Sequence, residues 1–304
     1  MASYLITQAT GQQSQSVIRH LLAAGLKVHA VVRDPQKVPA ILKSPGVTIF
    51  QGESTNFDEI IRAAQGCKGA FLNTFPIPGL EAQQAKTIAE ACKKAGVEFI
   101  VAATTFLTGN RSMWDDEATK GCGLHEYYAS KAAVEDAVRQ NFGDKAYTFL
   151  RPAFIHHDYF LPSVHLNFPE LATHRELAHC FNEGSRMPHT DAEDIGRYAL
   201  AAFQDPAKFG GQGIDLGNEA LTIEEVRDIL VKVSGKDITI RKRSPDEAEK
   251  TVMGQRFHFM ANVKDFSALK VATKEAQVKF GIPFTSFEQS MQRDKASLLE
   301  CLSA

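Results

Sequence analysis

The sequence predicts an α/β protein of the Rossmann type, with a doubly wound parallel sheet and a smaller C-terminal lobe. Apolar runs alternate with stretches of helical periodicity through the first 150 residues. Most of these runs are apolar on both faces, as strands of a parallel sheet are. The first run, residues 4–6, enters a small-residue turn that opens directly into an amphipathic helix. This order is typical of a dinucleotide-binding unit, where the helix N-terminus offers unpaired N–H groups to a pyrophosphate.

The elements of the first half follow in a regular order. After residues 4–6, the expected strands cover residues 27–32, 47–50, 69–73, 98–102 and 146–150. The expected helices cover residues 57–64, 81–95 and about 124–141, and Gly96 and Gly143 stop the last two. Pro35 follows the second strand and suits the first turn of a further helix.

The regular alternation of strands and helices ends at residue 151. Six histidines lie among aromatic residues and prolines in residues 151–190, which indicates loops and short elements on a substrate side. Residues 191–197 open a helix, and a capping box from Thr222 to Glu225 opens another. Thr285 and Glu288 predict a third capping box, at the start of a C-terminal helix over 286–299. We expect an NAD(P)-binding domain over residues 1–150 and a substrate-side lobe over 151–304, some segments of which complete the sheet.

Composition and charge exclude several classes of partner. The net charge of −2 favours neither nucleic acid nor an anionic membrane, and no apolar run approaches the ~20 residues of a membrane span. None of the five cysteines forms a C-x-x-C pair, and nothing at the N-terminus resembles a signal peptide. We therefore expect reduced thiols and a cytoplasmic protein.

The glycine fingerprint of the first turn is incomplete. Its three glycine positions read Gln8, Gly11 and Ser14, so only the glycine that lets the backbone approach the phosphates is kept. A helix N-terminus remains, and the sequence predicts phosphate contacts from four consecutive residues: Thr10, Gly11, Gln12 and Gln13.

Charges after the second strand indicate the type of dinucleotide. An acid at this place selects the ribose 2′-hydroxyl, whereas an arginine accommodates a 2′-phosphate. Arg33 precedes Asp34 here, and Lys37 adds a second cation, so we expect NADP(H) in preference to NAD(H). A solvated Arg33 at the end of a strand is the competing interpretation. Three residues at the end of the fourth strand also belong to the predicted cofactor site: Asn73, Thr74 and Phe75.

Several motifs in order resemble the NmrA-like family of atypical short-chain dehydrogenase/reductases. They are Thr-Gln-Ala-Thr-Gly-Gln-Gln-Ser, Ala-Val-Val-Arg-Asp-Pro, Val-Thr-Ile-Phe-Gln-Gly, Gly-Ala-Phe-Leu-Asn-Thr, Leu-Arg-Pro-Ala-Phe and Asp-Ala-Glu-Asp-Ile-Gly-Arg, spread over about residues 3–230. The resemblance implies a Rossmann fold and NAD(P) binding. The family contains NAD(P)H-dependent reductases and also dinucleotide sensors that regulate a protein partner.

A Tyr-x-x-x-Lys pattern on the predicted helix 124–141 bears on catalysis. Tyr127 and Lys131 lie on one helix face, where the lysine cation favours the phenolate and so lowers the tyrosine pKa. The tyrosine then suits the role of general acid. In the superfamily that the chain resembles, the lysine also holds the nicotinamide ribose, and a hydroxyl at the fifth strand completes the set. The resemblance gives that place to Thr104, with Thr105 as the alternative.

The histidine-rich stretch shows no metal-ligand spacing, so we expect no metal site. We expect His156, His157 and Tyr159 to line the substrate side. The predicted function is NADPH-dependent reduction of a small carbonyl, enone or quinone-like substrate. The alternative is a non-catalytic dinucleotide redox sensor that acts on a regulatory protein partner.

Overall fold

The computed structural model describes residues 2–77, 79–250 and 253–303. It confirms a Rossmann-type α/β fold with a parallel central sheet. The chain forms two compact units, each assembled from three segments. Unit 1 comprises Met1–Gly109, Glu126–Arg151 and Ala192–Ile214, and unit 2 comprises Asn110–His125, Pro152–Asp191 and Asp215–Ala304. The two-domain division expected from the sequence stays a prediction.

Unit 1 is built around a seven-stranded sheet in the order β3-β2-β1-β4-β5-β6-β10. Each neighbouring pair from β3 to β6 is parallel. The order reverses between β1 and β4, and this reversal is the point where open α/β sheets bind ligands. The strands are β1 (Ser3–Ile6), β2 (Lys27–Val32), β3 (Val47–Gln51), β4 (Cys67–Leu72), β5 (Phe99–Ala103), β6 (Tyr147–Pro152) and β10 (Gln212–Leu216).

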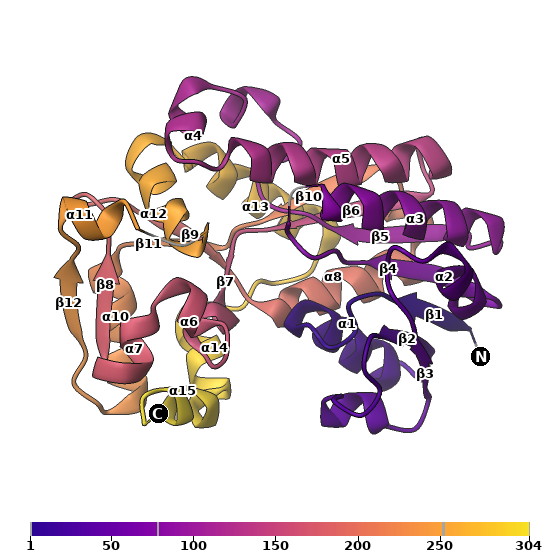
Figure 1. The fold of residues 1–304 in the computed structure, drawn as a ribbon, viewed down its shortest axis with the longest axis horizontal. Helices are drawn as coiled ribbons and strands as arrows, with labels where there is room; N and C mark the ends of the chain where they lie inside the picture. The colour runs from indigo at the N-terminus through magenta and orange to yellow at the C-terminus, as the bar shows by residue number, and fades with distance from the viewer. Residues whose placement is uncertain (1, 78, 251–252, 304) are drawn as a thin grey trace. The chain divides into compact units, whose positions relative to one another are not determined.

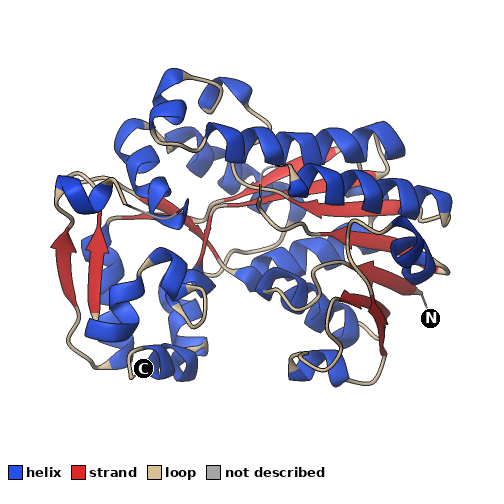
Figure 2. Cartoon of the chain, in the orientation of Figure 1, coloured by secondary structure: helices blue, strands red, loops and turns tan. Residues whose placement is uncertain are grey.

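Helices cover both faces of this sheet (Figures 1 and 2). On one face, buried side chains of β1, β4 and β5 pack against α2, α3 and α5 in a continuous apolar core. On the other face, α1 and α8 pack so closely that a Cβ on Gly196 would lie 2.5 Å from both His20 and Ser16. The helices of unit 1 are α1 (Gln12–Ala23), η1 (Ala40–Lys43), α2 (Phe57–Ala64), α3 (Leu80–Lys94), α5 (His125–Phe142), α8 (Ala192–Gln204) and α9 (Pro206–Phe209).

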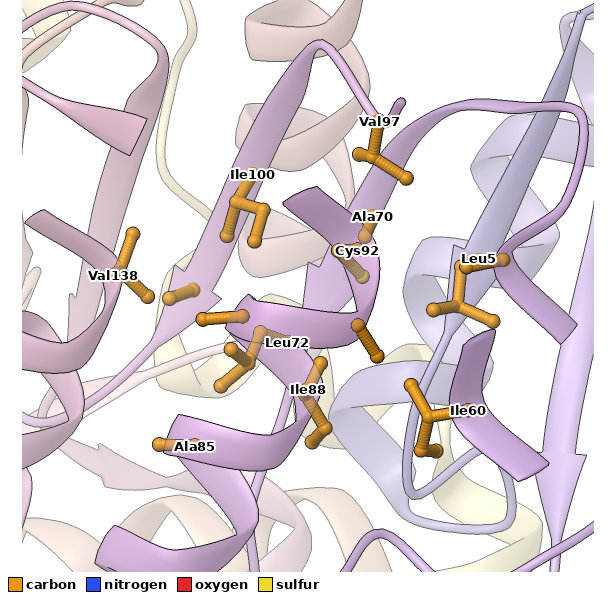
Figure 3. Close-up of a cluster of buried hydrophobic side chains, with 14 of the residues drawn as sticks. Leu5, Ile60, Ala70, Leu72, Ala85, Ile88, Cys92, Val97, Ile100 and Val138 are labelled. Atoms are coloured by element: carbon orange, nitrogen blue, oxygen red, sulfur yellow. The ribbon is translucent and has the colours of Figure 1, made fainter. Parts of the chain in front are cut away.

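The apolar core of unit 1 joins the strands of the sheet to the helices on one of its faces. Leu5, Leu72 and Ile100 come from three adjacent strands, and Ile60 and Ile88 come from the helices α2 and α3 that pack against them (Figure 3). All five side chains are fully buried, and burying a side chain of this size contributes about 1.5–3 kcal/mol to folding. The carboxyl ends of β1 and β4 therefore adjoin this buried core.

Unit 2 contains short strands and helices around a separate aromatic core. β11, β9 and β7 form one small sheet, and β12 and β8 form another. Its strands are β7 (Phe154–Ile155), β8 (Glu176–His179), β9 (Met187–Thr190), β11 (Glu219–Leu221) and β12 (Thr239–Lys242). Its helices are η2 (Arg111–Met113), α4 (Glu117–Gly121), η3 (His156–Tyr159), α6 (Val164–Asn167), α7 (Pro169–His174), α10 (Ile223–Ser234), α11 (Pro245–Ala248), α12 (Met253–Val263), α13 (Ser267–Phe280), α14 (Phe287–Arg293) and α15 (Lys295–Cys301).

Two expectations about local structure are wrong. Pro35 lies in a turn and opens no helix, because the Asp34 carboxylate accepts a hydrogen bond from the Gln36 N–H and closes a turn there. The C-terminal helix is divided at Asp294 into α14 and α15, and the N-cap of α14 is Ser286, whose capping box uses Gln289. The capping box at Thr222 is confirmed. Among the described helices, none has the length and apolarity needed to span a membrane.

Candidate functional site

A cleft in unit 1 lies at the carboxyl ends of the strands on either side of the reversal in strand order. Its volume is about 190 Å³. Four strand ends contribute to its lining: Thr10 after β1, Arg33 after β2, Ser54 after β3 and Phe75 after β4. This is where a doubly wound sheet places a ligand.

The helix that follows β1 begins beside this cleft. Gly11 is the N-cap of α1 in an extended conformation, no side chain caps the helix, and no acid lies in its first turn. The first N–H groups of α1 are therefore available to an anion, and the helix dipole favours negative charge there. Gln12 is exposed and Gln13 half-buried in this first turn, while Thr10 reaches the cleft itself.

Two residues that replace fingerprint glycines keep the shape of the turn. Gln8 adopts the left-handed conformation with φ of 48°, and its carbonyl accepts a hydrogen bond from Gly11 N–H at 2.9 Å. Ser14 is fully buried, and its hydroxyl donates to the Thr7 carbonyl at 2.9 Å. The helix and strand therefore remain tightly joined without the two glycines.

The two cations predicted to read a 2′-phosphate lie in different surroundings. Arg33 lines the cleft and is exposed. Lys37 is outside the cleft lining: its side chain is 85% exposed and its Nζ lies 3.6 Å from Asp34. The structure therefore brings Arg33 to the candidate site and leaves Lys37 on the surface. Glu53 also lines the cleft and brings a negative charge to it.

The three residues predicted at the end of β4 have three different roles. Asn73 joins this strand end to β1 and α1, because its N–H donates to Thr7 Oγ1 at 2.9 Å and its Nδ2 to Ser14 Oγ at 3.3 Å. Thr74 is buried, and its hydroxyl donates to Glu81 at 2.6 Å. Phe75 lines the cleft with its side chain half exposed, which suits packing against a ligand ring.

The Tyr127–Lys131 pair lies on α5, as the spacing predicts, and a buried acid joins it. Lys131 Nζ lies 5.5 Å from the centre of the Tyr127 ring and donates to Glu81 Oε1 at 2.7 Å. Lys131 is buried, and Glu81 is completely so. Although burial acts to lower the pKa of Lys131, Tyr127 and the Glu81 carboxylate raise it above the usual lysine value.

Among the described residues, no contact joins Thr104 to Tyr127. Its hydroxyl donates to Glu135 at 3.0 Å, and Glu135 also receives two 2.8 Å hydrogen bonds from Arg151. This buried network joins the ends of β5 and β6 to α5. The hydroxyl of Thr104 therefore contributes to this network, and its catalytic role stays a prediction.

The predicted substrate-side residues lie in unit 2, two of them in its core. Tyr159 is fully buried, stacks on Phe168 at 5.1 Å between ring centres and hydrogen-bonds to His189 at 3.0 Å. His156 is also buried, and burial holds its pKa well below the usual histidine value. His157 is half-buried against Phe160. The substrate role of these three residues stays a prediction.

Glu81 is the residue that sequence reasoning missed. A signal was present, because Glu81 lies on the same helix face as Ala85, Ile88 and Cys92, all of them buried. An acid at such a position must be paired, since an isolated buried charge is very costly. Across residues 2–77, 79–250 and 253–303, no three metal-ligating side chains come together.

Comparisons with known proteins agree with this architecture. The chain is 27% identical over 244 residues to Quinone oxidoreductase 2 of Escherichia coli (strain K12), and the match covers 79% of this chain and 77% of that protein. The structure of NmrA, a negative transcriptional regulator, is similar with a TM-score of 0.71 and 24% identity, over 96% of this chain and 94% of that one.

Further solved structures share the fold. An NADPH-dependent quinone oxidoreductase of Escherichia coli, complexed with NADPH, gives a TM-score of 0.67 at 21% identity, over 96% of this chain and 99% of that one. NmrA has been solved with NAD and with NADP. The NmrA-like family model matches residues 3–298, so the chain belongs to the NmrA-like family.

Proposed function

We propose that this protein binds NADP(H) in the cleft of unit 1 and reduces a small carbonyl, enone or quinone-like compound. The observation that carries the proposal is the uncapped N-terminus of α1 beside a cleft that Arg33 lines. A pyrophosphate needs the first feature and a 2′-phosphate uses the second.

The residues at the cleft fit such a dinucleotide. The first N–H groups of α1, which follow the N-cap Gly11, would hold the pyrophosphate. Arg33 would hold the 2′-phosphate by charge-assisted hydrogen bonds, and Phe75 would pack against a ring of the ligand. The dinucleotide, when bound, supplies a hydride to the substrate.

The protein's own part in the reduction is to deliver a proton. Tyr127 would donate the proton of its hydroxyl group to the substrate oxygen as a general acid. Lys131, whose ammonium lies over the Tyr127 ring, would stabilise the phenolate that remains. Thr104 is left out of this proposed set because its hydroxyl serves Glu135.

Two kinds of related protein bear on this proposal. One relative is named a quinone oxidoreductase, and a structure of this fold holds NADPH. Another protein of the same fold is a transcriptional regulator that has been solved with NAD and with NADP. The second candidate is therefore a dinucleotide sensor that acts on a protein partner. The incomplete glycine fingerprint, with Gln8 and Ser14 in two of the three glycine positions, favours it.

Binding and turnover together decide between the two. Calorimetry of NADPH and NADH comes first, and then absorbance of NADPH with a panel of quinones and ketones. We expect tighter NADPH binding and turnover of at least one compound. NADPH binding without turnover of any compound supports the sensor, and no binding of either dinucleotide contradicts both candidates.

Tyr127→Phe tests the proton donor, because it keeps the ring and removes the acid. A general acid contributes roughly 10²–10⁴-fold in rate, so turnover should fall by about that factor while NADPH affinity is nearly unchanged. Normal turnover by Tyr127→Phe contradicts the role given to this tyrosine.

A further inference from the structure

Glu81 is a completely buried carboxylate with three donors. Thr74 Oγ1 donates to it at 2.6 Å, Lys131 Nζ at 2.7 Å and Ser130 Oγ at 2.8 Å. The donors come from the end of β4 and from two successive residues of α5. Removing one partner from a buried ion pair leaves an uncompensated charge, so these groups depend on one another.

The same residue also closes the segment that lines the cleft. Its N–H donates to the Ile77 carbonyl at 2.9 Å, and one helical turn further on Gln84 Oε1 accepts from Phe75 N–H at 2.9 Å. Phe75 and Ile77 both line the cleft. Both are large apolar side chains that are about half exposed. Glu81 therefore contacts the cleft-lining segment with its backbone and Lys131 with its side chain.

The charge around Lys131 comes from few groups. Glu81 faces it from α3 and Tyr127 from its own helix, and these two groups are the ones that act on its ionisation besides burial. Glu135, one turn further along α5, is instead paired with Arg151 and Arg139. Burial, which lowers the pKa of Lys131, is thus opposed by Tyr127 and Glu81.

From this geometry we propose that Glu81 is a positioning residue, which holds Lys131 as an ammonium beside Tyr127 and ties it to the segment that lines the dinucleotide cleft. The link from this arrangement to catalysis rests on the proposed function. The effect of Glu81 on the ionisation of Lys131 does not rest on the proposed function, and this effect can be measured without any dinucleotide.

Glu81→Gln removes the charge and keeps the size of the side chain. The readout is the titration of the Lys131 Cε resonance by NMR in protein labelled with [ε-¹³C]lysine, assigned by its loss in Lys131→Arg. We expect the Lys131 pKa to fall by at least about one unit in Glu81→Gln, because burial then acts without a counter-charge. An unchanged titration in a folded Glu81→Gln protein overturns the proposal.

Ser130→Ala is the matched control. It removes one hydrogen bond to the same carboxylate but leaves the Glu81–Lys131 pair in place. The Lys131 titration should move by much less than in Glu81→Gln. Equal shifts in the two variants would mean that general loosening, and not the carboxylate charge, controls Lys131, and would overturn the proposal.

Stability gives a second test if Glu81→Gln alone does not fold. The double variant Glu81→Gln with Lys131→Met removes both buried charges. We expect it to fold, or to be more stable than Glu81→Gln, since no unpaired ammonium remains buried. A double variant that is no more stable than the single one contradicts the pairing.

The consequence for function is measured separately, by NADPH calorimetry and turnover across a pH series. Glu81→Gln should lose activity at a lower alkaline pH than the parent protein, with a larger change in kcat than in KM. The same alkaline limb in both proteins overturns the link to catalysis. A parent protein that binds no dinucleotide instead contradicts the proposed function, and the NMR titration still decides whether Glu81 holds Lys131.

Discussion

The Ser14 hydroxyl donates a hydrogen bond to the Thr7 carbonyl at 2.9 Å, joining the first turn of α1 to the end of β1. In the dinucleotide fingerprint this position is a glycine that allows helix and strand to pack closely. Here a small polar side chain occupies the contact, and Asn73 Nδ2 donates to the same hydroxyl at 3.3 Å. The departure from the fingerprint is therefore a hydrogen-bonded junction between β1, β4 and α1.

Ser14→Gly should therefore destabilise the protein, although it restores the fingerprint. It removes one buried and one part-buried hydrogen bond, each with a net contribution of about 0.5–1.5 kcal/mol. It also places glycine in a helix, where glycine is about 1 kcal/mol less favourable than alanine and less favourable than serine by a smaller amount. We expect the free energy of unfolding to fall by about 2–3 kcal/mol in urea denaturation. Ser14→Ala, which keeps helix propensity, should lose about half of that, and a Ser14→Gly protein as stable as the parent would show that the hydroxyl contributes nothing.

Gln8→Gly should act in the opposite direction. Gln8 has a φ of 48°, and a left-handed conformation costs a side-chain-bearing residue roughly 1–2 kcal/mol. Glycine removes this cost but gains freedom in the unfolded chain, so the net gain should be about 0.5–1 kcal/mol.

Arg175 offers a matched control for this substitution. It has a φ of 53° at the C-cap of α7, where glycine is favoured, and it belongs to unit 2. Arg175→Gly should give a similar gain in denaturation experiments. If Arg175→Gly stabilises and Gln8→Gly destabilises, the Gln8 side chain makes stabilising contacts that exceed its backbone cost.

Arg33→Ala should remove most of the preference for NADPH over NADH. Losing a charge-assisted contact to the 2′-phosphate costs about 1.5–3 kcal/mol, or about 10- to 100-fold in Kd, whereas NADH affinity should barely change. Calorimetry of both dinucleotides measures this directly.

Lys37→Ala is the control, because it removes a charge of the same sign outside the cleft. An exposed charge of this kind acts weakly through solvent, so the preference should change by less than about threefold. Equal losses in the two variants would indicate a general field of positive charge, with no direct contact at Arg33.

Local sequence signals predicted the fold well where periodicity is strong. The strand β2 and the helix α2 begin and end where their apolar patterns predict, at Lys27–Val32 and Phe57–Ala64. Each boundary is set by neighbours in the sequence: Asn56, for instance, caps α2 by accepting from two of its first N–H groups. Such signals need no knowledge of the rest of the fold.

The site depends more on contacts between distant residues, and these could not be predicted. Glu81 and Lys131 are separated by 50 positions in the sequence, and neither spacing nor composition relates them. Lys37 follows Arg33 closely, yet the turn at Asp34 leaves it on the surface. Thr104 lies after β5, in the expected region, but its hydroxyl donates to Glu135. The sequence signal for the burial of Glu81 was its position on the apolar face of α3.

Buried histidines in unit 2 give a prediction for acid stability. Burial keeps the pKa of His156 well below its usual value, lowers that of His189 to about 4, and lowers that of His258 to about 3. Unfolding exposes these rings, which then bind protons below their ordinary pKa of about 6.5. The unfolded state thus binds more protons than the native one from about pH 6.5 down to about pH 4, so stability falls as the pH falls through this window. Asp158 acts in the opposite direction, because burial raises its pKa to about 7.

His258→Phe isolates one of these contributions. The ring of His258 stacks on Phe168 and contacts Phe181 at a tilt, so phenylalanine suits the space, although it loses the 3.3 Å hydrogen bond from Cys180 N–H. A neutral buried histidine costs about 2 kcal/mol at pH 5, which is 1.5 pH units below the unfolded pKa. The stability lost between pH 7 and pH 5 in urea denaturation should therefore be smaller by about 2 kcal/mol in His258→Phe than in the parent. His174→Gln, at an exposed position of the same unit, should keep the parent's dependence; a His258→Phe protein with that same dependence would mean that His258 is already protonated in the native state at pH 5.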